Sequence, residues 1–218
     1  MRGCLKAVMA FGVVVALATP AMAQGRGGPG GGWGGGGPIA LLGRPEVQKE
    51  LKLTTEQTEK ATALATSTRE KMMAEMEGVD QADRMAKMQE VSKKLNEEGM
   101  KTVKAMLKEE QVSRLHQIDL QQRGLMAFTD KEIAKKLSIS DEQETKIKSI
   151  VADMQADARE IMQSAGDDRQ AANTKVMALR KETREKVMAL MSSDQKKAWK
   201  ELTGEPFTLA PMQLRPAR

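Results

Sequence analysis

A five-residue pattern that occurs four times constrains this 218-residue chain more than any other feature of its sequence. Each occurrence has an apolar residue first, an acidic residue fourth and Gln fifth, and the occurrences lie at 53–57, 107–111, 139–143 and 191–195. The third repeats the first at a sequence offset of 86, from 53 to 139, and the fourth repeats the second at an offset of 84, from 107 to 191. Because a nearly fixed offset is typical of repeat architectures, we predict a tandem duplication with one motif at each end of a copy.

The polar residues inside the pattern predict that it starts helices. Ser or Thr followed three residues later by Gln forms a capping box, in which the hydroxyl and the Gln side chain each accept a backbone N–H of the first turn. Three occurrences fit this rule, whereas Lys108 replaces the hydroxyl residue in the second. We therefore assign helix capping, and no catalysis, to Leu53, Thr54, Gln57, Gln111, Ile139, Ser140, Gln143, Ser192 and Gln195.

Residues 1–23 have the composition of an export signal. Arg2 and Lys6 precede a short apolar run, and residues 21–23 form an A-x-A cleavage site. The run is shorter than the roughly 20 residues of a membrane-spanning helix. We therefore expect cleavage after Ala23, a periplasmic or secreted location and no stable membrane insertion after cleavage, with an uncleaved anchor as the alternative. The mature chain then has no thiol, because Cys4 is the only Cys.

Composition and the repeat offsets divide the mature chain into four segments. Residues 24–38 are rich in Gly, which predicts a flexible linker. Residues 39–124 form the first copy and residues 125–210 the second. Residues 211–218 are expected to be a tail, and the Pro-containing stretch after Phe207 has the same character.

Apolar residues recur at steps of three and four through both copies, which predicts amphipathic helices. Long helices are expected at about 54–77 and 81–107, around a turn at 78–80, and again on either side of a turn at 165–168. Short helices are expected at about 45–52, 110–122, 131–138 and 194–202. No segment alternates with period two, so the predicted fold is all-α, with two tandem α-hairpin repeats in an elongated, curved body. The stripes are poor in large apolar residues, so either the hairpins pack on each other or the chain forms a homodimer.

Charge and residue types argue against most chemical functions. The mature chain has 33 Lys and Arg, after removal of Arg2 and Lys6, against 30 Asp and Glu, which is too balanced for nucleic-acid binding. The single His116 has no partners that indicate a triad or a zinc site. The Gly-rich stretch lacks the Lys of a phosphate-binding loop. We therefore expect no catalytic residue, no cofactor, no metal ligand set of His or Cys, and no enzymatic activity.

Methionine is the remaining compositional signal, because most of the 17 Met of the chain follow the cleavage site. Met72, Met73 and Met76 precede the first turn and Met85 and Met88 follow it, so we expect a hairpin to bring these five near one tip. Three interpretations stay open. The cluster is pliable core packing, an adaptable surface that binds client proteins, or a thioether site for Cu(I).

The Leu-Thr-x-x-Gln motifs, the signal and the Met- and charge-rich hairpins resemble the Spy/CpxP family of bacterial periplasmic proteins, the LTXXQ-motif family. The run at residues 41–57 is also similar to planctomycete-type secreted proteins. The resemblance covers nearly the whole mature chain, with one family unit in each copy. It departs from the family at Lys108, and the chain lacks the His- and Cys-containing tail of the zinc-responsive relatives.

The resemblance implies an ATP-independent chaperone that holds unfolded proteins on a cradle-like surface, or a stress-response adaptor that binds envelope proteins. Family members form this cradle as dimers, so two units in one chain imply that one molecule can supply the same surface. A copper-handling protein and an envelope spacer are the alternative functions.

Overall fold

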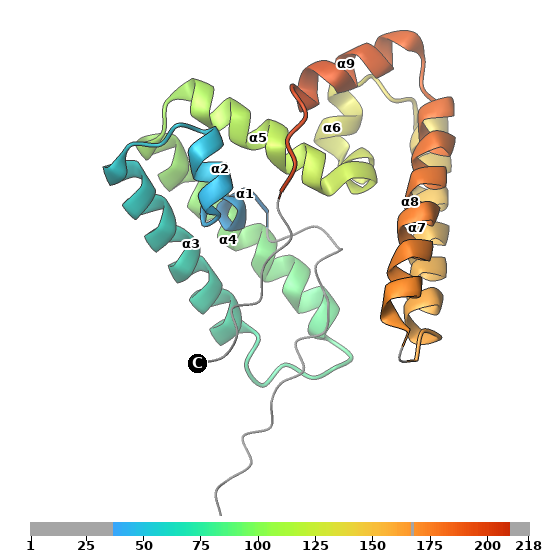
Figure 1. Ribbon diagram of the computed structural model, residues 1–218, viewed down its shortest axis with the longest axis horizontal. Coiled ribbons are helices and arrows are strands. Elements are labelled where there is room, and N and C mark those ends of the chain that lie inside the picture. Colours follow the sequence, from blue (N-terminus) through green and yellow to red (C-terminus); the bar gives the residue numbers. More distant parts are fainter. Residues whose placement is uncertain (1–36, 167, 210–218) are drawn as a thin grey trace, which may run out of the picture. The chain divides into compact units, whose positions relative to one another are not determined.

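The computed structural model describes residues 37–166 and 168–209, and this part of the chain contains helices and no strand (Figure 1). The predicted all-α class is thus confirmed. Residues 1–23 and 211–218, for which a signal and a tail were predicted, lie outside the described residues. The elements in chain order are α1 (Gly37–Leu42), α2 (Pro45–Glu50), α3 (Thr55–Glu75), α4 (Arg84–Met106), α5 (Glu109–Arg123), the 3₁₀ helix η1 (Gly124–Thr129), α6 (Lys131–Lys136), α7 (Asp141–Gln163), α8 (Arg169–Ala189) and α9 (Ser193–Thr203).

The spacing of these elements follows the two offsets of the sequence motif. α3 begins at residue 55 and α7 at residue 141, which reproduces the larger offset. α5 begins at residue 109 and α9 at residue 193, which reproduces the smaller one. In both halves of the described chain, a long helix pair lies between short helices. The long helices α3 and α4 pack against each other, as do α7 and α8 (Figure 1).

The connection between α3 and α4 is longer than the sequence predicts. α3 ends at Glu75 and α4 begins at Arg84, so the expected start at residue 81 was wrong. Gly78 turns the chain at φ +71°. The Asp83 N–H donates to the Asp80 carbonyl at 3.1 Å, so residues 80–83 form a turn and α4 begins after it. No side chain caps α4 at Asp83. Gly166 plays the corresponding part between α7 and α8, with φ +52°.

Two short helices were not predicted, and one of them overlaps the expected linker. α1 includes Gly37 and Pro38, which were assigned to the Gly-rich segment. It forms because Ile39 packs against the backbone of Gly99 in α4, where an added Cβ would lie 2.8 Å from the Ile39 Cδ1 atom. Gly99 is thus a point of close approach between helices. η1 occupies the position after α5 and packs against α5, α6 and α7.

Buried apolar side chains form two clusters, which we call the first and second cores. The two meet on α5, where Ile118 belongs to the first core and Leu120 to the second. The first core comprises Ile39, Leu41, Leu42, Val47, Leu51, Ala61, Val103, Leu107, Leu115 and Ile118. The second comprises Leu120, Leu125, Ala127, Phe128, Ile133, Leu137, Ile147, Val151, Met154, Val187 and Met191.

Candidate functional site

The four motifs start helices, and three of them form complete capping boxes. At α3 the Thr54 hydroxyl accepts from the Gln57 N–H at 3.2 Å, and the Gln57 Oε1 accepts from the Thr54 N–H at 3.0 Å. The same pair of bonds starts α7 at Ser140 and α9 at Ser192. At α5 only the second bond forms, because the Lys108 side chain carries no acceptor; the Gln111 Oε1 still accepts from the Lys108 N–H at 2.9 Å.

The motif glutamines also join helix starts that are far apart in the sequence. The Gln57 Nε2 donates to the Gln111 Oε1 at 3.0 Å and to the Met106 carbonyl at 3.0 Å. In return the Gln111 Nε2 donates to the Gln57 Oε1 at 3.2 Å and to the Leu51 carbonyl at 3.0 Å. Each amide thus caps its own helix with its oxygen and reaches across with its nitrogen. We call this arrangement a glutamine clasp.

A second glutamine clasp has the same form. The Gln143 Nε2 donates to the Gln195 Oε1 at 3.0 Å and to the Leu190 carbonyl at 2.6 Å. The Gln195 Nε2 donates to the Gln143 Oε1 at 2.9 Å and to the Ser138 carbonyl at 2.9 Å. The apolar first residue of each motif is buried or half-buried against a core. This geometry assigns the motif residues to fold stabilisation.

The five methionines of the α3–α4 end differ in exposure. Met72 and Met76 are half-buried. Met73 is 64% exposed, Met85 54% and Met88 44%. In α8, Met177 is 63% exposed. The exposed side chains are available for contact with a partner, whereas Met72 and Met76 contribute partly to packing.

The exposed methionines of α4 continue its buried stripe. Val91, Leu95 and Val103 are buried on α4, and Met85 and Met88 precede them at steps of three residues. The Lys94 Nζ lies 4.0 Å from the Glu75 Oε1 in the last turn of α3. Lys94 is therefore level with the end of α3. Counted from Lys94 towards the start of α4, Met88 and Met85 lie about 1.7 and 2.5 turns away, at 3.6 residues per turn, so they extend past the end of α3. They share one end of the helix pair with Met73.

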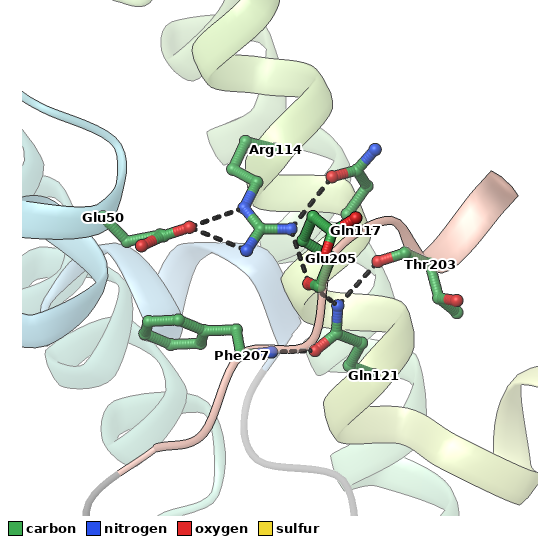
Figure 2. Close-up of polar contacts among 7 residues, drawn as sticks. All are labelled: Glu50, Arg114, Gln117, Gln121, Thr203, Glu205 and Phe207. Carbon is green, nitrogen blue, oxygen red and sulfur yellow. Dashed lines mark hydrogen bonds and ion pairs between the residues drawn. The ribbon is translucent and has the colours of Figure 1, made fainter. Parts of the chain in front are cut away.

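The segment after α9 packs against the first core. Phe207 and Leu209 are half-buried there, and they alternate with the exposed Pro206 and Thr208. The expectation of a tail-like stretch after Phe207 was therefore wrong for residues 208 and 209, because Leu209 packs against the first core. The physical reason is that two side chains of α5, Arg114 and Gln121, hold the backbone of this segment (Figure 2).

Figure 2 shows the contacts that hold this segment. The Glu50 Oε1 accepts from Arg114 Nε at 2.8 Å and Nη2 at 2.7 Å, which fixes the guanidinium. Arg114 Nη1 then donates to the Glu205 carbonyl at 2.9 Å. Gln121 Nε2 donates to the carbonyls of Thr203 and Glu205 at 2.6 and 2.7 Å. Its Oε1 accepts from the Phe207 N–H at 2.7 Å.

An open cavity of about 820 Å³ is lined by parts of α1, α4, α5, α6 and α9. Its charged lining carries both signs, including Lys104, Asp119, Arg123 and Lys136. Burial raises the pKa of Asp119 to about 6, against the opposing charge of Arg123. Partial burial lowers the pKa of His116, and the charges of Lys104 and Lys136 lower it further. The mixed lining gives the cavity no preference for an anion or a cation.

Sequence reasoning missed Arg114, Gln121 and Phe207. The available signal was a departure from the internal repeat, because Ala198 and Glu205 occupy the positions of the second copy that correspond to Arg114 and Gln121. Arg114 is thus a charged side chain that one copy alone carries, and Gln121 differs in type from its counterpart Glu205, so the repeat does not explain either residue.

No protein-family model, curated protein or solved structure matches the chain. Within residues 37–166 and 168–209, no helix has the length and apolar character that a bilayer span requires. The same residues contain no group of three or more His, Cys, Asp or Glu side chains placed to hold a metal ion.

Proposed function

We propose that this chain is an exported helical binding protein that holds unfolded envelope proteins without ATP, as a periplasmic chaperone or stress-response adaptor. One structural observation supports the proposal. The apolar stripe of α4 continues past the last turn of α3 as the exposed side chains of Met85 and Met88, and Met73 is exposed at the same end.

The chemistry of this end suits a weak and adaptable contact. Methionine is unbranched and polarisable, so it packs against partners of different shape. The polar side of α4 carries ion pairs with solvent-exposed members, between Lys87 and Glu90 at 3.5 Å and between Lys93 and Glu97 at 3.9 Å. Exposed ion pairs contribute little to stability, so their Lys and Glu side chains can pair instead with charged side chains of an unfolded client.

The test is suppression of aggregation of a chemically denatured client by residues 24–218. Replacing Met73, Met85 and Met88 with Gln should weaken client affinity about tenfold or more, because even partial burial of three Met side chains contributes more than about 1.4 kcal/mol. Met73→Gln and Met177→Gln are a matched pair, with exposures of 64% and 63% in the two halves of the chain. Met73→Gln should weaken suppression of client aggregation, and Met177→Gln should not.

The alternative functions give different results in the same proteins. A copper-handling protein would lose Cu(I) binding on replacement of Met72, Met73, Met76, Met85 and Met88, while client holding stayed unchanged. An envelope spacer would show neither activity in the unchanged chain. Equal loss of holding in Met73→Gln and Met177→Gln would contradict the assignment of the client surface to the α3–α4 end.

A further inference from the structure

The segment at residues 205–209 lies on the first core as an extended peptide lies on a receptor. Its side chains alternate, with Phe207 and Leu209 packed against the core and Pro206 and Thr208 exposed. Such alternation is typical of a bound extended strand, in which every second side chain enters the binding surface.

The hydrogen bonds to this segment are made to its main chain. Arg114 and Gln121 both donate to the Glu205 carbonyl, and Gln121 accepts from the Phe207 N–H (Figure 2). Main-chain atoms are the same in every sequence, so these contacts supply affinity without selecting residues. Selection is left to the apolar positions 207 and 209.

The receptor side of the contact is held in place by other residues. Glu50 fixes the Arg114 guanidinium with two bonds, so the Nη1 atom is directed at the segment before any peptide binds. Such preorganisation lowers the entropy that binding costs. The chain leaves α9 at Gly204, with φ +61°, where an added Cβ would lie 2.3 Å from the Gln117 Oε1. Gly204 therefore permits the tight departure that places the segment on α5.

We propose that the surface formed by Arg114, Gln121 and the adjoining first core is a peptide-binding site for extended segments with apolar residues at alternate positions. The segment at residues 205–209 is its occupant in cis, and an unfolded client segment displaces it. The ligand class rests on the proposed function, but this site is separate from the methionines of the α3–α4 end. Because the segment at residues 205–209 is part of the same chain, its effective concentration at the site is roughly millimolar. A free peptide therefore binds well only when this segment has left the site.

The experiment measures fluorescence anisotropy of a labelled peptide with the sequence of residues 203–210, Thr-Gly-Glu-Pro-Phe-Thr-Leu-Ala. The full mature chain carrying Phe207→Ser and Leu209→Ser should bind this peptide at least about tenfold more tightly than the unchanged chain, because the tethered competitor is removed. Phe207→Ala alone is a milder change and should give an intermediate gain. Thr208→Ala, at an exposed position, should give none.

A second pair of variants tests the receptor side. Adding Gln121→Ala to the doubly substituted chain should reverse most of the gain, whereas Gln122→Ala, at the next position of the same helix, should not. The proposal is overturned if the Phe207→Ala chain, shown to be helical by circular dichroism, binds the peptide no better than the unchanged chain. It is also overturned if Gln121→Ala and Gln122→Ala have the same effect. Because the readout is binding of one peptide, this result is independent of client aggregation.

Discussion

Gly99 shows how the absence of one side chain allows α1 to pack on α4. The Ile39 side chain lies where a Cβ at position 99 would be, with its Cδ1 and Cγ1 atoms both 2.8 Å from that point. The corresponding residue of the second copy is Thr183, which is also buried and whose hydroxyl donates to the Leu179 carbonyl at 2.8 Å. Both helices thus carry a small residue at this position, and the first half requires the smallest.

Gly99→Ala should lower the free energy of unfolding by about 1–2 kcal/mol, because overpacking outweighs the gain in helix propensity of about 1 kcal/mol. Ile39→Ala should cost about 2–5 kcal/mol in the unchanged chain and clearly less when combined with Gly99→Ala, since the added methyl fills part of the cavity. Urea unfolding of the unchanged chain, the two single variants and the double variant gives the coupling. Additive effects would show that the two positions are not in contact.

At the scale of the element, the glutamine clasp determines how pairs of helix starts are held together. Each motif places an apolar residue in or against a core, a cap residue next, and a Gln that serves two helices. The bonds donated by Gln57 to Met106 and Gln111 join the start of α3 to the end of α4 and the start of α5. Helix capping alone does not require an amide, because a capping box accepts Glu as well as Gln at this position.

Gln57→Glu separates the two functions of the side chain. The Glu carboxylate can still accept the Thr54 N–H, but it cannot donate to the Met106 carbonyl or to Gln111. We expect a loss of about 1–3 kcal/mol in the free energy of unfolding, from two lost hydrogen bonds and an unpaired carbonyl. Thr54→Ala, which removes only the cap hydroxyl, should cost about 0.5–2 kcal/mol. If urea unfolding finds the Gln57→Glu chain as stable as the unchanged chain, then Gln57 acts only as a helix cap and the bonds donated by its Nε2 add no stability.

The helices could be predicted because their signals are local. Capping boxes and three- and four-residue apolar steps gave the starts of α3, α7 and α9 to within one residue. The partners of Gln57 and Gln143 could not be predicted, because they lie 54 and 52 positions away and depend on tertiary packing. The contact of Phe207 with the first core was missed for the same reason. The exposure of Met85 and Met88 depends on where α3 ends beside α4, which is a tertiary feature that no local pattern predicts.

Across the whole described chain, one buried carboxyl lies where the two cores meet. Asp119 is 6% exposed and stands between Ile118 of the first core and Leu120 of the second. The nearest opposite charge is weakly placed, with the Arg123 Nη1 at 3.8 Å from the Asp119 Oδ2. Arg123 bonds more closely to Asp130, at 2.7 Å. Burial thus dominates, and it raises the pKa of Asp119 to about 6.

This pKa makes global stability depend on pH in a definite direction. A carboxyl whose pKa is 3.8 when unfolded and about 6 when folded binds its proton more tightly in the folded chain. Ionisation of Asp119 therefore lowers the free energy of unfolding. This loss is absent below pH 3.8, grows as the pH rises towards 6, and is complete above pH 6. Asp119→Asn removes this loss and should raise the free energy of unfolding by about 1–3 kcal/mol at pH 8, at about 1.36 kcal/mol for each pKa unit. At pH 4 the two chains should be nearly equal.

Urea unfolding of both chains between pH 4 and 8 checks this prediction. The lowered pKa of His116 acts in the opposite direction, since protonation of that side chain below pH 6.5 destabilises the folded chain. His116 is present in both proteins, so its contribution cancels to first order in the difference between them. A difference that stays constant with pH would show that Asp119 keeps an ordinary pKa and that water reaches the junction of the two cores on α5. A difference that grows from pH 4 to 6 would show that folding raises the pKa of Asp119, through burial first and the negative charge of Asp130 second, against the charge of Arg123.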